Sequence, residues 1–146
     1  MLYKQTVNIK DRNIEKVIDS FHKRDFINFL ISFQPVKIIK WDGIENNLSA
    51  HLKFWLFKWH SFIVIHKNYM RTDNSLSFVD KGTTLPLGIT EWNHLHKVEY
   101  SNNKIVIGDS IEFKHRYYIF EFMLYPILIS PIIMRKFLYK IYFKKN

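Results

Sequence analysis

Two alternating segments joined by a short turn make up residues 88–115, GITEWNHLHKVEYSNNKIVIGDSIEFKH. Alternate side chains of a strand share a face. Trp92, His94 and His96 therefore share one face of the first segment, and mainly charged residues occupy its other face. In the second segment the corresponding face is apolar except for Asp109. This pattern predicts a β-hairpin with one buried face, into which both histidines point.

The pairing of these two strands follows from the turn between them. Asn102–Asn103 suits a two-residue turn, because asparagine tolerates the positive φ that such turns require. The predicted cross-strand pairs are Tyr100 with Ile105, Val98 with Ile107, His96 with Asp109, His94 with Ile111 and Trp92 with Phe113. A buried acid requires a partner, so we expect His96 and Asp109 to lie within reach, with Cβ atoms about 5 Å apart.

The same reasoning applies to the preceding hairpin, whose turn is Asp73–Asn74. The predicted pairs are Tyr69 with Phe78 and Lys67 with Asp80, on a face shared with Ile63, Ile65 and Leu76. His66 then lies on the opposite face from Lys67. Two polar pairs among apolar neighbours are typical of a cavity with a few polar anchors, which is how small-molecule sites are usually built.

The other elements follow from hydrophobic spacing and from turn residues. Residues 2–9 alternate like a strand, and residues 14–21 and 26–30 carry apolar side chains at helical spacing. Asp11 or Asn13 is a candidate N-cap for the first helix, and Asp25 for the second. Further strands are predicted at residues 35–41, 48–57, 61–71, 75–82, 91–100 and 104–115, with Asp42–Gly43 as a hairpin turn. We see no linker or repeat, so we expect a single domain over residues 1–146.

The C-terminal segment, residues 117–143, is the longest apolar stretch. Its first part, residues 117–133, approaches a membrane span in length, but Glu121, Pro126 and Pro131 interrupt it. After Pro131 the spacing is amphipathic, with lysines on one side. The opposite side carries Met134, Phe137, Leu138 and Ile141. We therefore expect a helix bent at its prolines and laid across the sheet, with a membrane span as the alternative.

This order of elements resembles the START-related superfamily, also called SRPBCC or the helix-grip fold. The resemblance is carried by FVDKGTTLPLGITEWNHLHKVE (residues 78–99), IGDSIEF (residues 107–113) and MRKFLYKIYF (residues 134–143). Within the superfamily, the chain is most similar to small bacterial proteins of the polyketide cyclase/dehydrase-like and cell-division-inhibitor-like type. Their motif is matched here by Phe78, Asp80, Leu85–Pro86, Trp92, His94, His96 and Asp109. Where those proteins have Gly-Pro-Phe, this chain has Leu-Pro-Leu-Gly, so the mouth of the cavity is expected to differ.

The resemblance implies an α+β helix-grip fold, in which a curved antiparallel sheet of six to seven strands wraps around a long C-terminal helix. Two short helices follow the first strand, and an apolar ligand cavity lies between sheet and helix. It implies no particular ligand, since one fold hosts many functions. The predicted ligand contacts are Trp92, His94, His96, Asp109, Lys67, Asp80, Tyr69, Phe78, Ile111, Phe113, Met134 and Phe137.

Two functions are consistent with these residues, beside a purely structural role for the His96–Asp109 pair. The first is binding of a small hydrophobic molecule, such as a lipid, a polyketide or an isoprenoid-like compound. The alternative is a cyclase or dehydratase, in which Asp109 orients His96 for proton transfer on a bound carbonyl compound. Ser110 follows Asp109 but points outward, which argues against a hydrolytic triad.

Metal binding is not expected, because zinc at His94 and His96 requires a third ligand and none converges by spacing. No other cofactor is predicted. The chain carries a net charge of +9 and no cysteine. Nucleic-acid binding is not expected, because the aromatic residues fall mainly on buried faces. Peripheral membrane contact through the basic C-terminal helix is a further hypothesis. The absence of cysteine and of a visible signal peptide favours a cytoplasmic location.

Overall fold

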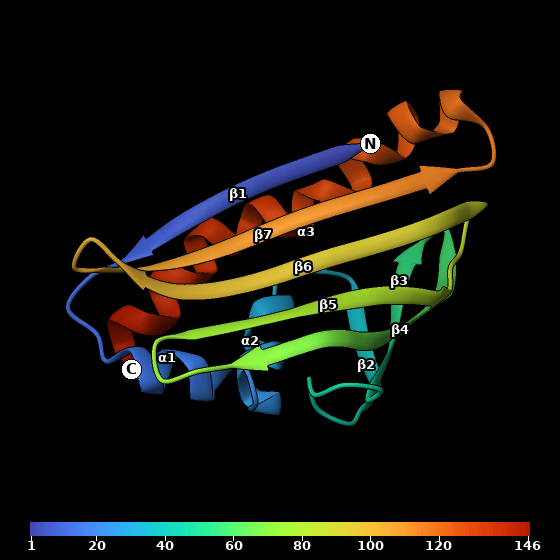
Figure 1. Cartoon of the computed structure of the whole chain (residues 1–146). Helices are drawn as coiled ribbons and strands as arrows, with labels where there is room; N and C mark the ends of the chain where they lie inside the picture. The colour runs from blue at the N-terminus through green and yellow to red at the C-terminus, as the bar shows by residue number, and fades with distance from the viewer.

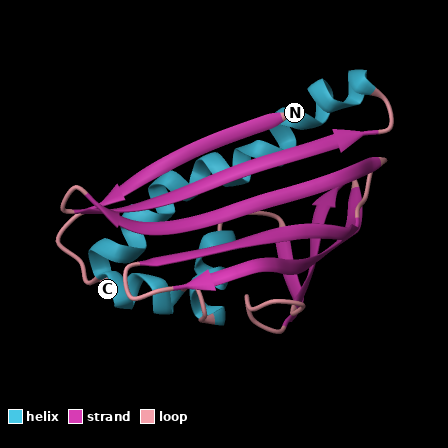
Figure 2. Cartoon of the chain, in the orientation of Figure 1, coloured by secondary structure: helices cyan, strands magenta, loops and turns pink.

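A seven-stranded antiparallel sheet curves around one long helix in the computed structural model, which describes residues 1–146 (Figures 1 and 2). The elements in chain order are β1 (Leu2–Ile9), α1 (Ile14–Ser20), α2 (Arg24–Ile31), β2 (Val36–Trp41), β3 (Ser49–Leu56), β4 (Lys58–Arg71), β5 (Ser75–Thr84), β6 (Ile89–Ser101), β7 (Lys104–His115) and α3 (Tyr118–Lys145). The strand order is β1-β7-β6-β5-β4-β3-β2. The predicted helix-grip fold, with two short helices after the first strand, is confirmed.

The N-terminal part differs from prediction in two local details. Asn13 caps α1 as predicted, since its side chain accepts a hydrogen bond from the Lys16 amide at 3.2 Å. The predicted cap of α2 is wrong, because Lys23 holds that position and Asp25 lies in the first turn. Asp42–Gly43 does not form a two-residue hairpin either. Residues 42–48 form a longer loop, whose Ile44 side chain is buried in the core.

The β6–β7 hairpin has the predicted pairing throughout. His96 lies opposite Asp109, His94 opposite Ile111, and Trp92 opposite Phe113. The turn residues Asn102 and Asn103 both have positive φ, at 51° and 58°. Because this turn admits one pairing, it fixes which side chains of both strands face inward.

The predicted pairing of β4 with β5 is correct only near the turn. Met70 lies opposite Ser77, as the turn requires, but Lys67 lies opposite Val79 and His66 opposite Asp80. The reason is a β-bulge between Lys67 and Met70, where Asn68 has a φ of 55°. One extra residue moves every following side chain to the other face. Lys67 therefore points outward, with its Nζ donating to Asn47 Oδ1 at 2.6 Å, and His66 is buried.

Helix α3 covers the concave face, where it packs against β1, β7 and α2 (Figure 1). It runs through both prolines as one helix, as predicted. The predicted inner side is wrong in part, because Phe137 is 65% exposed whereas Leu138 is buried. Met134 is half-buried against the core. The helix is apolar on nearly every side, so its spacing did not identify the side that meets the sheet.

Two apolar clusters lie between the sheet and the helices. The larger cluster joins α1, α2 and the C-terminal part of α3 to the sheet, and it includes Phe78, Val98 and Ile107. The smaller cluster joins the middle of α3 to the other end of the same strands, and it includes Trp92 and Ile111. Along β6, the residues between Trp92 and Val98 on this face are His94 and His96. The two apolar clusters are therefore separated by polar side chains.

Candidate functional site

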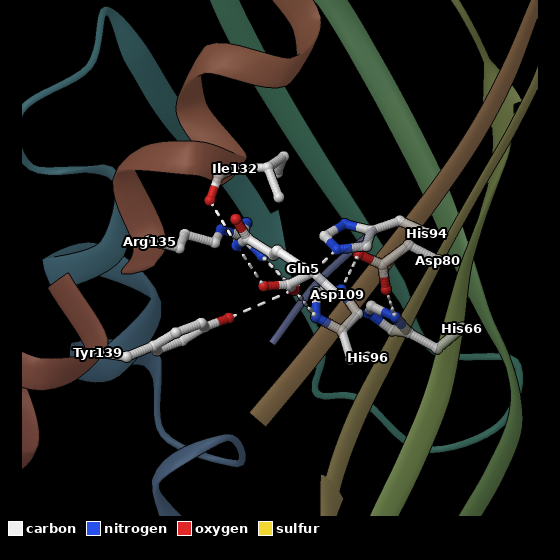
Figure 3. A network of polar contacts seen from close by, with 9 residues as sticks. All are labelled: Gln5, His66, Asp80, His94, His96, Asp109, Ile132, Arg135 and Tyr139. Carbon is white, nitrogen blue, oxygen red and sulfur yellow. Dashed lines mark hydrogen bonds and ion pairs between the residues drawn. The ribbon is translucent and has the colours of Figure 1, made fainter. Parts of the chain in front are cut away.

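A layer of polar side chains crosses the interior between the two apolar clusters (Figure 3). We call it the polar layer; its members are Gln5, His66, Asp80, His94, His96, Asp109, Arg135 and Tyr139. They come from β1, β4, β5, β6, β7 and α3. Alternation along the strands brings the first six to the concave face, and the four-residue spacing of Arg135 and Tyr139 places both on the inner side of α3.

Asp109 of β7 is the centre of one half of the polar layer. Its carboxylate accepts hydrogen bonds from Gln5 Nε2 at 2.9 Å, His94 Nε2 at 3.0 Å and the Tyr139 hydroxyl at 3.4 Å. The Arg135 guanidinium lies 3.7 Å away. Burial by itself would raise the pKa of Asp109, but the hydrogen bond from His94 and the nearby His96 and Arg135 hold that pKa well below its usual value. Asp109 is thus a buried, ionised carboxylate.

Asp80 of β5 is the centre of the other half. Its two oxygens accept hydrogen bonds from two histidines, His66 Nδ1 at 2.8 Å and His96 Nε2 at 2.9 Å. Burial opposes ionisation, but the charge of His96 and both hydrogen bonds hold the pKa of Asp80 well below its usual value. A half-buried carboxylate, Asp80, and a buried one, Asp109, therefore lie in one interior, each oriented by neighbouring side chains.

Two neighbouring histidines in this layer have opposite protonation tendencies. The rings of His94 and His96 are 3.8 Å apart between centroids. Burial and the charge of His96 lower the pKa of His94 to about 4. Burial also disfavours a charged His96, but Asp80 and Asp109 outweigh it and raise the pKa of His96. The layer thus pairs an imidazole that favours the neutral form with one that favours the charged form, and the positive charges of Arg135 and protonated His96 offset the two carboxylates.

Two buried nitrogen atoms in the layer have no hydrogen-bond partner in the protein. They are Nε2 of His66 and Nδ1 of His96. His96 Nδ1 lies 3.4 Å from Asp109 Oδ1, close enough for charge attraction but not aligned as a hydrogen bond. The Gln5 amide, in contrast, is fully engaged, since it also donates to the Ile132 carbonyl at 2.7 Å. Buried polar atoms are nearly always paired, so these two nitrogens identify the part of the layer that is open to a further partner.

The structure supplies the third metal-ligand candidate that the sequence did not place. Donor atoms of Asp80, His94 and His96 lie within 4.8 Å of one another, and nitrogen and carboxylate ligands suit zinc-like ions. However, Asp80 and His96 already hydrogen-bond each other, and Arg135 places a positive charge beside Asp109. A second cation at this position would be repelled, so the arrangement favours a hydrogen-bonded network over a metal centre.

Most of the predicted contact residues lie around the polar layer. Phe78 stacks on His96 with ring centroids 4.5 Å apart. Trp92, Ile111 and Phe113 are buried in the smaller apolar cluster. Tyr69 lies farther away, where its hydroxyl meets His22 Nε2 at 2.8 Å. As described above, Lys67 and Phe137 point outward and are not part of this interior.

Four members of the layer were missed from the sequence. Gln5 shares the inward alternation of Val7 and Ile9, so strand parity could have identified it. His66 was assigned to the wrong face because of the bulge at Asn68. Arg135 and Tyr139 are four residues apart on α3, a spacing that places them on one side of a helix. No pattern in an almost uniformly apolar helix indicates that this side is the inner one.

Two surface hollows are separate from the polar layer. One, of about 430 Å³, lies between the end of β1 and the C-terminal turns of α3 and is lined by charged residues such as Arg12 and Lys144. The other, of about 250 Å³, adjoins it near Tyr100 and Lys104. Neither is lined by a member of the polar layer. The apolar cavity implied by the resemblance stays a prediction.

The fold and the site together define a helix-grip protein with an ionised polar layer beneath its long helix. No protein-family model matches the sequence, and a search of curated proteins gives no significant match. Solved structures are similar in fold. A norcoclaurine synthase point mutant from Thalictrum flavum, in complex with a transition-state analogue, has a TM-score of 0.67 and 14% identity, over 99% of this chain and 94% of that chain.

Two further structures show how widely this architecture occurs. Ara h 8.0201 has a TM-score of 0.56 and 11% identity, over 100% of this chain and 99% of that chain. A hypothetical protein from Helicobacter pylori has a TM-score of 0.60 and 14% identity, over 79% of this chain and 70% of that chain. At such identities the likeness shows the fold alone.

Proposed function

We propose that the protein binds a small, largely apolar molecule between the concave face of the sheet and α3, with a polar group of that molecule at the polar layer. The observation that supports this proposal is the pair of buried nitrogens without a partner, His66 Nε2 and His96 Nδ1. An unsatisfied buried polar atom costs about 1–3 kcal/mol. A hydroxyl or carbonyl group of a ligand would remove that cost.

The surroundings of the layer suit an apolar ligand body. Apolar clusters lie on both sides of it, with Phe78 on one side and Trp92 and Phe113 on the other. A norcoclaurine synthase of the same fold was solved in complex with dopamine and hydroxybenzaldehyde, which supports the idea that this architecture admits small aromatic molecules. Lipids, polyketides and isoprenoid-like compounds with one polar end have the chemistry that this interior would accept.

The binding proposal is tested by recovery of a bound molecule. The purified protein is incubated with a lipid extract of the expression host, re-isolated by gel filtration, and its organic extract is analysed by mass spectrometry. We expect a compound that is retained by the wild type and by His51→Leu, a control histidine that contacts Ser61 outside the layer. The His66→Leu variant should retain much less. Equal recovery from all three proteins, or recovery from none, would contradict the proposal.

A second candidate function, an acid–base enzyme, is favoured by the opposed histidines. The pKa of His94 is lowered to about 4, so this imidazole is neutral near pH 7 and can accept a proton, whereas the pKa of His96 is raised, which favours its charged form as a proton donor. Titratable neighbours with separated pKa values are the usual arrangement of general acids and bases. Asp109 orients His94 and Asp80 orients His96, rather than Asp109 acting on His96 as the sequence suggested.

The enzyme proposal is tested by proton exchange at a carbonyl compound. Acetophenone, an apolar ketone with exchangeable α-protons, is incubated with the protein in D₂O, and deuterium uptake is followed by NMR. We expect uptake above the buffer rate for the wild type and loss of it in His94→Gln. Uptake at the buffer rate by the wild type would leave ligand binding as the function that the geometry supports.

Two partner and location hypotheses from the sequence also remain proposals. The basic, largely apolar helix α3 supports the predicted peripheral contact with a membrane. The cytoplasmic location, which was inferred from cysteine usage and from the N-terminal sequence, stays a prediction.

A further inference from the structure

The outer side of α3 carries a continuous exposed stripe of mainly apolar side chains. We call it the outer stripe; its members are Ile119, Phe122, Met123, Pro126, Ile127, Ser130, Ile133, Phe137, Lys140, Ile141 and Lys144. They recur at intervals of three and four residues, the spacing of one side of a helix. From Ile119 to Phe137 the only polar member is Ser130, and this part of the stripe is about 27 Å long at 1.5 Å per residue.

Packing in the core does not explain why the residues of the outer stripe are apolar. The opposite side of α3 already packs on the sheet, through residues that include Leu128, Ile132 and Phe143. A helix that covers one face of a sheet normally has polar residues on its outer side. Here Met123 is 60% exposed and Phe137 is 65% exposed. Contiguous exposed apolar surface of this kind marks an interaction site.

The charges on α3 indicate the kind of partner. The single acid of the helix, Glu121, is buried and pairs with the N-terminal ammonium at 3.4 Å. All other charges on α3 are positive: Arg135, Lys136, Lys140, Lys144 and Lys145. Lys10 and Arg12 line the same hollow as Lys140 and Lys144, so this end of the helix forms a basic patch. Asp11 is the one acid that lines this hollow, beside four basic residues. An apolar stripe that ends in a patch of net positive charge complements a bilayer that contains anionic lipid.

The helix is suited to lie on a membrane rather than to cross it. It is 28 residues long and contains an 18-residue stretch with a mean hydropathy of 1.4, which is sufficient for a span. Crossing would require α3 to leave the sheet, and would remove Arg135 and Tyr139 from Asp109 and Glu121 from the His115 amide. These contacts are all on the inner side, so docking through the outer stripe leaves them intact.

We propose that the outer stripe docks on an anionic membrane surface, with the axis of α3 parallel to the plane of the bilayer. Apolar side chains from Ile119 to Phe137 enter the boundary between headgroups and acyl chains, and Lys140 and Lys144 contact lipid phosphates. This proposal uses a different face from the polar layer and does not depend on ligand binding or on acid–base chemistry. A membrane-docked helix would, however, bring the interior beneath α3 close to membrane-dissolved apolar molecules.

The experiment measures co-sedimentation of the purified full-length chain with large unilamellar vesicles. One set contains phosphatidylcholine alone, and the other contains phosphatidylcholine and phosphatidylglycerol at about 3:1. We expect binding to the anionic vesicles at low salt and weaker binding as salt is added, because salt screens surface charge. The Lys140→Glu/Lys144→Glu double variant should bind these vesicles on the order of tenfold or more weakly.

Matched variants separate the outer stripe from general surface effects. Ile133→Ser/Phe137→Ser removes two exposed apolar groups and should weaken binding by roughly tenfold or more. Phe33→Ser, which changes an aromatic residue that is 70% exposed and lies outside the outer stripe, should have little effect. Lys4→Glu/Lys81→Glu makes the same charge change at exposed positions on strands β1 and β5, and should weaken binding much less than the change on α3.

Three results would overturn the proposal. The first is no binding to anionic vesicles at low salt by a folded wild-type protein. The second is equal loss of binding in the stripe variants and in their controls. The third is a stable dimer in analytical ultracentrifugation that Ile133→Ser/Phe137→Ser converts to a monomer, because a second copy of the chain would then cover the outer stripe.

Discussion

His96 donates a hydrogen bond from Nε2 to Asp80 at 2.9 Å, although the sheet places Asp80 opposite His94. The contact is therefore diagonal, which brings the other edge of the His96 ring toward Asp109 at 3.4 Å. A single imidazole thus lies between the half-buried Asp80 and the buried Asp109, and links the two halves of the polar layer. A substitution at His96, Asp80 or Asp109 should therefore change the hydrogen bonding of both halves.

Substitution of Asp109 should separate loss of charge from loss of shape and hydrogen bonding. Asp109→Leu removes the acceptor used by Gln5 and His94 and leaves Arg135 without its counter-charge. We expect it to lower the free energy of unfolding by about 3–5 kcal/mol. Asp109→Asn keeps an accepting oxygen and should cost less, about 1–3 kcal/mol. Urea unfolding at pH 7 measures both.

The control for this pair is Glu112→Leu, which changes an exposed acid on the same strand. It should stay within about 0.5 kcal/mol of the wild type. If Asp109→Leu proved as stable as Asp109→Asn, the carboxylate would not be the acceptor described here. If Asp109 also acts in catalysis, Asp109→Asn should keep ligand binding and lose proton exchange.

The bulge in β4 can be tested at Asn68. Its φ of 55° lies in the left-handed region, which asparagine tolerates and β-branched residues do not. We expect Asn68→Val to destabilise the protein by about 1–2 kcal/mol, whereas Asn68→Gly should be close to neutral because glycine adopts positive φ freely. Equal stability of the two variants in urea would argue against the bulge, and with it against the inward position of His66.

Stability should depend on pH through His94. Its pKa is about 4 in the folded protein, below the ordinary value of 6.5. Between pH 6.5 and 4 the unfolded chain binds a proton that the folded protein excludes, so the free energy of unfolding should fall as the pH falls through this window. Asp80 and Asp109, whose pKa values are lowered, add stability above pH 3.8 that is lost below it.

His96 acts in the opposite sense, because its pKa is raised. Its contribution is complete below pH 6.5 and is lost as the pH rises through its folded-state pKa. Urea unfolding from pH 3 to 9 should therefore show maximal stability near pH 6.5, where the window of His94 ends and that of His96 begins. In His94→Gln the slope between pH 6.5 and 4 should become shallower. An unchanged slope would mean that His94 does not exclude its proton.

The C-terminal end of α3 is held by a side chain from the other end of the sequence. The Arg12 guanidinium donates to the carbonyl oxygens of Phe143 and Lys144, the latter at 3.0 Å. Arg12→Ala should free these carbonyls and speed amide hydrogen exchange in the last turn of α3, with little effect on core strands. Arg12→Lys should have an intermediate effect, because an ammonium cannot donate as a planar fork. Arg24→Ala, an exposed control, should leave exchange unchanged.

The sequence was most informative where a turn left little freedom. Asn102–Asn103 allows one pairing, so every inward residue of β6 and β7 could be predicted, including His94, His96 and Asp109. The β4–β5 hairpin has an equally short turn, yet its pairing changes at Asn68. Apolar residues occupy both faces of β4, so alternation could not reveal the change.

The helix shows the corresponding limit for the candidate site. An amphipathic helix identifies its own inner side, but α3 is apolar on its inner and outer sides alike. The side that meets the sheet is marked by tertiary contacts, namely those of Arg135 and Tyr139 with Asp109. Helical spacing carries no information about these contacts. Sequence spacing alone therefore assigned Phe137 to the interior and overlooked both polar partners.

The position of Gln5 has a consequence for how the chain folds. Its amide contacts Asp109 and Ile132, which are 104 and 127 residues away in the sequence. Contacts over such separations slow folding, because long loops must close before the contact forms. A slip of β1 by one residue would place Lys4 or Thr6 opposite Asp109 and leave the carboxylate without its amide partner. During collapse, the polar layer thus destabilises compact states in which β1 pairs with β7 in a shifted register.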